Sequence, residues 1–141
     1  MPITLTVPEG LLSTEAEART FAELSDALLS VAQLKGNAFM TPNVVGTLNV
    51  LPKTRVFAGG RPAAAAFIEL TLPQIALASR DSKQAFIEAA TSAVERAAGG
   101  RLKREHIWTN IVYAADGSWG IGGRAFNSEN LVDAIQQAAA Q

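Results

Sequence analysis

The chain has 141 residues, a length that favours one domain and lets folding bury roughly 68–70% of the unfolded surface. It is 48% hydrophobic and 18% charged, and its formal net charge is −1. This balance excludes a general electrostatic attraction to nucleic acid or anionic lipid, and the lack of cysteine excludes disulfide and thiol chemistry.

No charged segment followed by a short apolar segment marks a leader, and no apolar run approaches about 20 residues. We therefore expect a cytoplasmic protein that binds neither membrane nor nucleic acid. The densest basic run, RLKRE at 101–105, follows a Gly-Gly break, and we interpret it as a solvated loop in preference to a phosphate-binding patch.

The first half of the chain has the pattern of a strand, a helix, a second strand and a glycine-rich turn. Apolar and polar residues alternate over Ile3–Val7, which is typical of a strand. Ser13 or Thr14 can cap a helix that Gly36 would end. The run NVVGTLNVLP predicts the second strand, and RVFAGGRP the turn.

The second half repeats this order. The run AAFIELTLPQIAL predicts a strand, Asp81 or Ser82 can cap the following helix, and Gly99-Gly100 would end it. HIWTNIVYA predicts another strand, and DGSWGIGGRAF the matching turn. Gly36 and Gly99 are 63 residues apart, and the two glycine-rich turns are about 64 apart. A spacing this long indicates a duplicated domain and not a solenoid.

The duplication predicts an α/β (α+β) fold. Because βαβ crossovers are right-handed and pair their strands in parallel, two fused units form a four-stranded sheet with two long helices on one face. We expect a single domain with repeat one at about 2–62, repeat two at about 63–127 and a short C-terminal helix at about 128–141. Asn127 or Ser128 would cap this helix, which packs on its own domain or reaches a neighbour.

Several of these segments resemble the tautomerase superfamily. IWTNIVYAADGSWGIGGRAFNS is similar to the strand and hairpin of the 4-oxalocrotonate tautomerase (4-OT) family, and PITLTVPEG to that family's first strand. The duplicated length resembles the long, fused members, which include macrophage migration inhibitory factor and cis-3-chloroacrylic acid dehalogenase. The resemblance covers roughly 2–128 and implies a homotrimer that needs no cofactor.

The resemblance implies that Pro2 is catalytic. Removal of Met1 would leave Pro2 with a secondary amine at the mature N-terminus. An ordinary α-amino group has a pKa of about 7.7–8.0, and an apolar pocket near cations lowers that pKa. The amine would then be a neutral general base near physiological pH. From its position alone, Pro2 is also an ordinary first residue of a strand.

The resemblance also suggests substrate-binding residues. Short members carry an arginine after the first strand, where this chain has Leu11, but Arg80 takes the matching place in the second repeat. Its guanidinium can bind a carboxylate through two parallel hydrogen bonds. Trp108 and Asn110 share one strand face and match pocket residues of the family. The alternative is that Trp108 belongs to the core and that Asn110 is an exposed strand residue. Trp119 matches an apolar pocket wall.

Weaker candidates are Arg61 and Arg124, each of which follows a Gly-Gly pair. His106 is the only histidine, so neither a metal site nor a serine triad is expected. Dehalogenating members use a histidine on the first helix and an acidic residue near the hairpin. This chain has no histidine there, and Asp116 is only a distant substitute.

We therefore expect a cofactor-independent tautomerase in which Pro2 transfers a proton on a small, carboxylate-bearing enol or 2-oxo acid. One alternative is a hydratase, dehalogenase or decarboxylase that uses the same proline. The other is a non-catalytic trimeric binding protein. Retention of Met1 would favour it, because an acylated nitrogen cannot act as a base.

Overall fold

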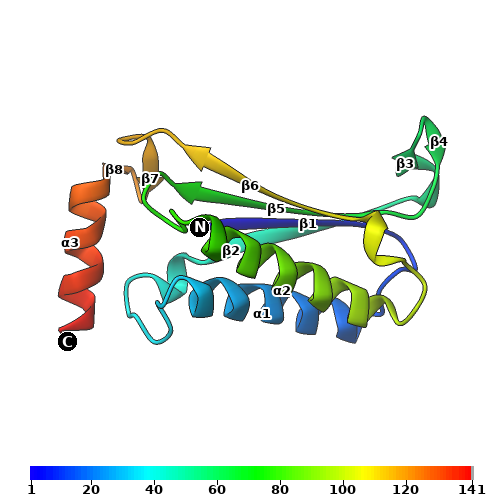
Figure 1. Cartoon of the computed structure of the whole chain (residues 1–141), viewed down its shortest axis with the longest axis horizontal. Helices are drawn as coiled ribbons and strands as arrows, with labels where there is room; N and C mark the ends of the chain where they lie inside the picture. The colour runs from blue at the N-terminus through cyan, green and yellow to red at the C-terminus, as the bar shows by residue number, and fades with distance from the viewer. Residues whose placement is uncertain (141) are drawn as a thin grey trace.

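The computed structural model describes residues 1–140, which form a four-stranded sheet with two long helices on one face (Figure 1). The strands are β1 (Pro2–Pro8), β2 (Val45–Leu51), β3 (Phe57–Ala58), β4 (Arg61–Pro62), β5 (Ala66–Pro73), β6 (Ile107–Ala114), β7 (Trp119–Ile121) and β8 (Arg124–Phe126). The helices are α1 (Thr14–Val31), α2 (Arg80–Ala98) and α3 (Ser128–Ala139), with 3-10 turns η1 (Thr41–Asn43), η2 (Lys53–Arg55) and η3 (Arg104–His106).

The four long strands have the order β2-β1-β5-β6. Strand β1 is parallel to β2, and β5 is parallel to β6, as two βαβ units require. The central pair β1 and β5 is antiparallel, with Ile3 opposite Leu70 and Leu5 opposite Ile68. This arrangement confirms the predicted fold of two fused βαβ units. It places the start of β1 and the end of β5 at one end of the sheet.

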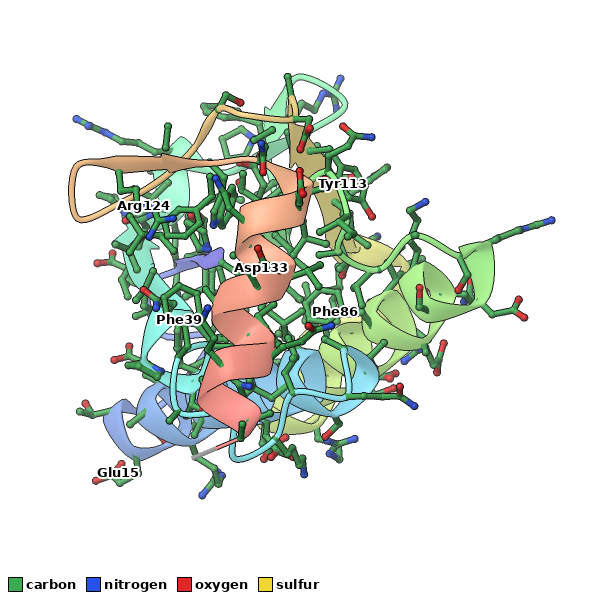
Figure 2. All side chains as sticks on the ribbon, turned by 90° about the vertical axis from the view of Figure 1, so that its left-hand side faces the viewer. Glu15, Phe39, Phe86, Tyr113, Arg124 and Asp133 are labelled. Carbon is green, nitrogen blue, oxygen red and sulfur yellow. The ribbon has the colours of Figure 1, made fainter. Side chains whose placement is uncertain are left out.

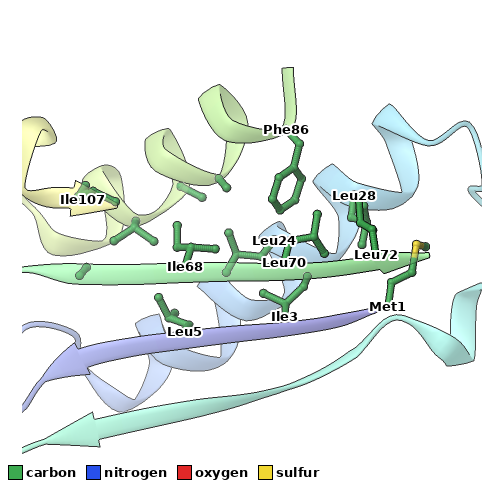
Figure 3. Close-up of a cluster of buried hydrophobic side chains, with 14 of the residues drawn as sticks. Met1, Ile3, Leu5, Leu24, Leu28, Ile68, Leu70, Leu72, Phe86 and Ile107 are labelled. Atoms are coloured by element: carbon green, nitrogen blue, oxygen red, sulfur yellow. The ribbon is translucent and has the colours of Figure 1, made fainter. Parts of the chain in front are cut away.

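The hydrophobic core lies between the sheet and the two long helices. Alternate strand residues point toward α1 and α2, and Ile3, Leu5, Ile68 and Leu70 are buried there (Figure 3). Phe86 of α2 is fully buried against the same cluster. The α1 and α2 helices therefore cover one face of the sheet, and in Figure 1 no helix lies on the other face.

The helix caps agree in part with the prediction. The Oγ of Ser13 accepts a hydrogen bond from the backbone N–H of Ala16 at 3.2 Å, so Ser13 caps α1. Gly36 does not end this helix: it ends at Val31, and Gln33 turns the chain with a φ of 58°. The helix therefore ends five residues before Gly36, at a turn that contains no glycine.

The predicted cap of α2 was wrong. Its N-cap is Ser79, whose Oγ accepts from the backbone N–H of Ser82 at 3.0 Å. Asp81 lies in the first turn, where its negative charge faces the positive end of the helix dipole. The helix ends as predicted at Gly99, which has a φ of 58°.

The C-terminal helix packs on its own chain. Asn127 caps α3, Leu131 is buried, and the side-chain amide of Asn37 donates to the carbonyl of Ile135 at 3.0 Å. In Figure 1, α3 stands at one side of the molecule, next to the β7–β8 hairpin. Residue 141, the end of the predicted helix, lies outside the described residues. Within residues 1–140, no helix has the length and apolar character needed to cross a membrane.

Candidate active site

Pro2 lies at the mouth of a cavity of about 420 Å³ at one end of the sheet. The cavity is bounded by the start of β2 at Val45, the end of β5 at Thr71, the end of β6 at Ala114 and the hairpin residues 118–121. These segments meet because β1 and β5 are antiparallel. Among the described residues, no charged side chain lines this cavity.

The amine of Met1 lies beside this cavity. It donates a hydrogen bond to the backbone carbonyl of Asn43, and the carbonyl of Met1 accepts from the N–H of Val45 at 3.3 Å. Burial lowers the pKa of this amine from its ordinary value of 8.0 to about 6. With Met1 in place, the nitrogen of Pro2 belongs to a peptide bond and cannot take up a proton.

The side chain of Met1 belongs to the core. Its exposed fraction is only 2%, and it extends the alternating row of Ile3 and Leu5 on the helix-covered face. Because Ile3 pairs with Leu70, Met1 lies at the level of Leu72, and Figure 3 shows it at that end of the cluster. The junction of Met1 and Pro2 therefore separates an apolar core from an uncharged cavity.

Trp119 lines the cavity from the β7–β8 hairpin. Its exposed fraction is 8%, and its indole N–H has no hydrogen-bond partner within residues 1–140. The β7–β8 hairpin pairs Trp119 with Phe126, and the ring centroid of Phe126 lies 6.0 Å from that of Phe39. The indole is therefore held at the cavity by a hairpin that is itself packed on the core.

Arg80 is the first residue of α2 and is exposed. It follows β5, whose end lies beside the start of β1, so Arg80 and Pro2 belong to the same end of the sheet. Arg80 is not among the residues that line the Pro2 cavity within one protomer. Within one protomer, the structure therefore shows no contact of Arg80 with this cavity.

The loop before Arg80 is held by two residues that the sequence analysis did not single out. The hydroxyl of Tyr113 donates toward the carbonyls of Ala76 and Leu77, at 2.8 and 2.9 Å. Nζ of Lys83 donates to the carbonyl of Ala78 at 3.2 Å and lies 5.4 Å from the centroid of the Tyr113 ring. Burial raises the pKa of the Tyr113 hydroxyl. The loop that precedes Arg80 is thus tied to β6.

Trp108 and Asn110 lie on the open face of the sheet, away from the helices. Trp108 is opposite Phe67 and 58% exposed, so it is not a core residue, and Asn110 is opposite Glu69 and exposed. Neither residue lines the Pro2 cavity within one protomer. The two side chains share a strand face, as predicted, but that face is displaced from the cavity.

The weaker candidates lie on the two hairpins. Arg124 of β8, labelled in Figure 2, is exposed, and its guanidinium lies 4.7 Å from the ring centroid of Phe126. Arg61 of β4 is also exposed and lies on the other hairpin, at the far end of the sheet (Figure 1).

A carboxylate oxygen of Asp116 accepts hydrogen bonds from the backbone N–H and the Oγ of Ser128, at 2.6 and 2.7 Å. Asp116 therefore binds the first residue of α3.

No family model matches the sequence, and no curated protein sequence matches it. Solved structures do match its fold. A symmetric trimer of a wild-type fused 4-OT is 17% identical, with 92% of this chain and 97% of that chain covered and a TM-score of 0.76.

Two further structures match equally broadly. A member of the cis-3-chloroacrylic acid dehalogenase family is 16% identical, with both chains covered to 100% and a TM-score of 0.75. Macrophage migration inhibitory factor of Toxoplasma gondii is 16% identical, with coverages of 89% and 100% and a TM-score of 0.71. At these identities the likeness shows the fold alone, which this chain shares with all three structures.

Proposed function

We propose that this protein is a cofactor-independent tautomerase. Pro2, freed by removal of Met1, acts as the general base in keto–enol proton transfer on a small, carboxylate-bearing enol or 2-oxo acid. The observation that carries the proposal is the position of Pro2, at the first residue of β1 and the mouth of an uncharged cavity. The neighbouring Met1 amine, whose pKa burial lowers to about 6, supports the use of this place for a neutral amine.

The proposed reaction needs only one group that both takes up and returns a proton. The neutral amine of Pro2 removes a proton from a carbon next to the substrate carbonyl, or from the enol oxygen. It then returns that proton to the other position, so that substrate and product are isomers. A dry cavity favours this step because burial keeps the amine unprotonated near neutral pH. The indole of Trp119 excludes water from one side.

The lining of the cavity favours a substrate with one negative charge and an apolar body. Because none of the described residues places a charged side chain in the cavity, the carboxylate would lie at the rim, where Arg80 is the proposed binder. Loss of Met1 would open apolar space beside Leu72, next to the freed amine. A short aliphatic or aromatic group of the substrate fits that space better than a second charge does.

The open face of the sheet supports a homotrimer. Four large apolar side chains on this face are more than a third exposed in the single chain, namely Val45, Phe67, Trp108 and Val112. Contact with a neighbouring protomer would bury them. The fused 4-OT with this fold is itself a trimer. In such an assembly, Trp108 and Asn110 would face a neighbouring protomer. Their proposed contact with substrate is then made across the interface.

Burial of Met1 also supports a second candidate function, a non-catalytic trimeric binding protein that retains Met1. Its side chain is 2% exposed, and its amine is hydrogen-bonded to Asn43. A hydratase or dehalogenase on the same proline has less support, because Asp116, the acidic residue near the hairpin, is engaged by Ser128.

Intact mass spectrometry of the purified protein separates the two candidates. The tautomerase proposal requires that Met1 be absent. The mature protein should then isomerise an enol 2-oxo acid, followed by ultraviolet absorbance, and Pro2→Ala should lower kcat/KM at least about tenfold. Full retention of Met1 in the purified trimer, or undiminished activity of Pro2→Ala, would sink the proposal.

A covalent probe identifies the base directly. One solved structure with this fold is of a protein inactivated by 2-oxo-3-pentynoate. The alkyne of 2-oxo-3-pentynoate is conjugated to a carbonyl, so a neutral amine can attack it. We expect one equivalent to attach to the N-terminal peptide of the mature chain, and no attachment to a chain that retains Met1. Attachment elsewhere would contradict the role of Pro2.

A further inference from the structure

A second cavity, of about 400 Å³, lies at the opposite end of the central strand pair from Pro2. It is bounded by the turn after β1 (Pro8–Leu11), by Lys53 and Thr54 of η2, by the segment before β5 (62–64) and by Arg101. Figure 1 shows the β3–β4 hairpin at this end of the sheet and the β7–β8 hairpin at the other. The two cavities are therefore counterparts in the two halves of the duplicated fold.

The two counterparts differ in charge. The Pro2 cavity is lined by no charged side chain among the described residues, whereas the second cavity is lined by Lys53, Arg101 and Glu9. Its remaining walls are largely apolar, and they include Pro8, the buried Leu11 and the residues before β5. The second cavity thus combines an apolar interior with two cations and one carboxylate.

Both cations are available to a ligand. Within residues 1–140, neither Lys53 nor Arg101 forms an ion pair or a side-chain hydrogen bond, and both are exposed at the rim. Arg104 of the same basic run behaves differently, because Glu88 and Glu95 bind it at 2.6 and 2.7 Å. The basic run 101–105 therefore contains one arginine committed to structure and one that borders a cavity.

The turn after β1 lies beside the end of the Lys53 side chain. Gly10 has a φ of +81°, and Leu11 N–H donates to the carbonyl of Pro8 at 3.2 Å to close the turn. A Cβ on Gly10 would lie 3.6 Å from Cε and 3.7 Å from Nζ of Lys53. The ammonium group consequently lies over the bare backbone of the turn, on the edge of the cavity.

We propose that this second cavity is a non-catalytic binding site for a small organic monocarboxylate with a compact apolar body. Lys53 and Arg101 bind the carboxylate, and the proline and alanine walls hold the apolar part. Glu9 leaves the lining with a single net positive charge, which favours a monoanion over a phosphate or a dianion. The site has no base equivalent to Pro2, since the nitrogens before β5 are in peptide bonds.

The proposal is tested by ¹⁹F NMR titration of the full-length protein with 4-fluorobenzoate. Lys53→Gln and Arg101→Gln should each weaken binding at least about threefold, and the double variant about tenfold. Lys103→Gln is the matched control, because it removes the same charge from the same basic run outside the cavity. It should change the dissociation constant less than about twofold.

Two further measurements distinguish binding at this site from binding in the Pro2 cavity and from binding that does not depend on the carboxylate. Arg80→Gln should leave 4-fluorobenzoate binding within about twofold, and neutral 4-fluorobenzamide should bind at least about fivefold more weakly than the acid. Circular dichroism checks that each variant is folded. The proposal is overturned if the double variant binds 4-fluorobenzoate like wild type or if Arg80→Gln abolishes binding. It is also overturned if the amide binds as well as the acid, or if wild type shows no binding at millimolar 4-fluorobenzoate. Its failure would leave the assignment of Pro2 untouched.

Discussion

At the scale of single residues, the amine at the start of β1 determines the proposed chemistry. Pro2 is an ordinary strand residue in its geometry, and what distinguishes it is the surrounding medium, core on one side and an uncharged cavity on the other. The same surroundings lower the pKa of the Met1 amine to about 6. The environment of the N-terminus, more than the identity of any single residue, supports a neutral amine there.

This burial predicts a pH dependence of stability for chains that retain Met1. The amine titrates near 6 in the folded chain and near 8.0 in the unfolded chain, so the unfolded state binds more protons between these values. The free energy of unfolding should therefore rise as the pH increases from about 6 to 8. Urea denaturation across this range measures it.

An N-terminally acetylated chain is the control for this prediction. It lacks the titrating amine, and any remaining pH dependence then comes from other groups. We expect a smaller rise in stability for the acetylated chain than for the free one. Identical pH profiles for both chains would show that the Met1 amine is not desolvated in the folded state.

At the scale of elements, the position of α1 depends on a glycine in the edge strand β2. Gly46 pairs with Ile3, and a Cβ at this position would lie 2.0 Å from the Ile3 carbonyl oxygen and 2.5 Å from Cζ of Phe21. Backbone atoms cannot yield at such a distance. The glycine therefore permits the close approach of β1, β2 and α1 that orders the first repeat.

Gly46→Ala should consequently destabilise the fold by about 1–3 kcal/mol, because the methyl group forces β2 and the Phe21 ring apart. Urea unfolding measures this change. Gly120→Ala is the matched control: no atom lies within 4 Å of its added Cβ, and its φ is not positive. It should stay within about 0.5 kcal/mol of wild type. Equal effects of the two substitutions would contradict the packing seen at Gly46.

At the scale of the whole molecule, the two faces of the sheet differ in kind. One face is covered by α1 and α2, and the other carries exposed apolar side chains, with Trp108 58% and Phe67 38% exposed. A face of this composition is stabilised by contact with another apolar surface. The proposed trimer supplies that contact.

Trp108→Glu should therefore disrupt the assembly, because it would bury an unpaired charge in the proposed interface. Size-exclusion chromatography with light scattering should find a trimer for wild type and smaller species for the variant. Ala85→Glu, at an exposed position of α2, is the control and should leave the trimer intact. A monomeric wild type at micromolar concentration would refute the proposed interface.

Local patterns in the sequence were sufficient for most of the elements. Alternation over 3–7 predicted β1, and repeated strand, helix and turn signals predicted two fused units. The caps were less certain: Ser13 was among the predicted choices for α1, whereas Ser79 was missed for α2. Several adjacent polar residues can each accept a backbone N–H, and the loop geometry selects one of them.

The sequence by itself determined the duplicated plan, since periodicity and glycine-rich turns are local consequences of backbone and side-chain chemistry. Only the tertiary structure decided which residues share a cavity. The antiparallel pairing of β1 with β5 brings Pro2 near Trp119 at one end of the sheet, while Lys53 and Arg101 border a cavity at the other end. The parallel register of β5 with β6 places Trp108 and Asn110 on the face that the helices leave open. The physical reason is that strand register and packing set distances between segments far apart in the chain, which no local pattern encodes.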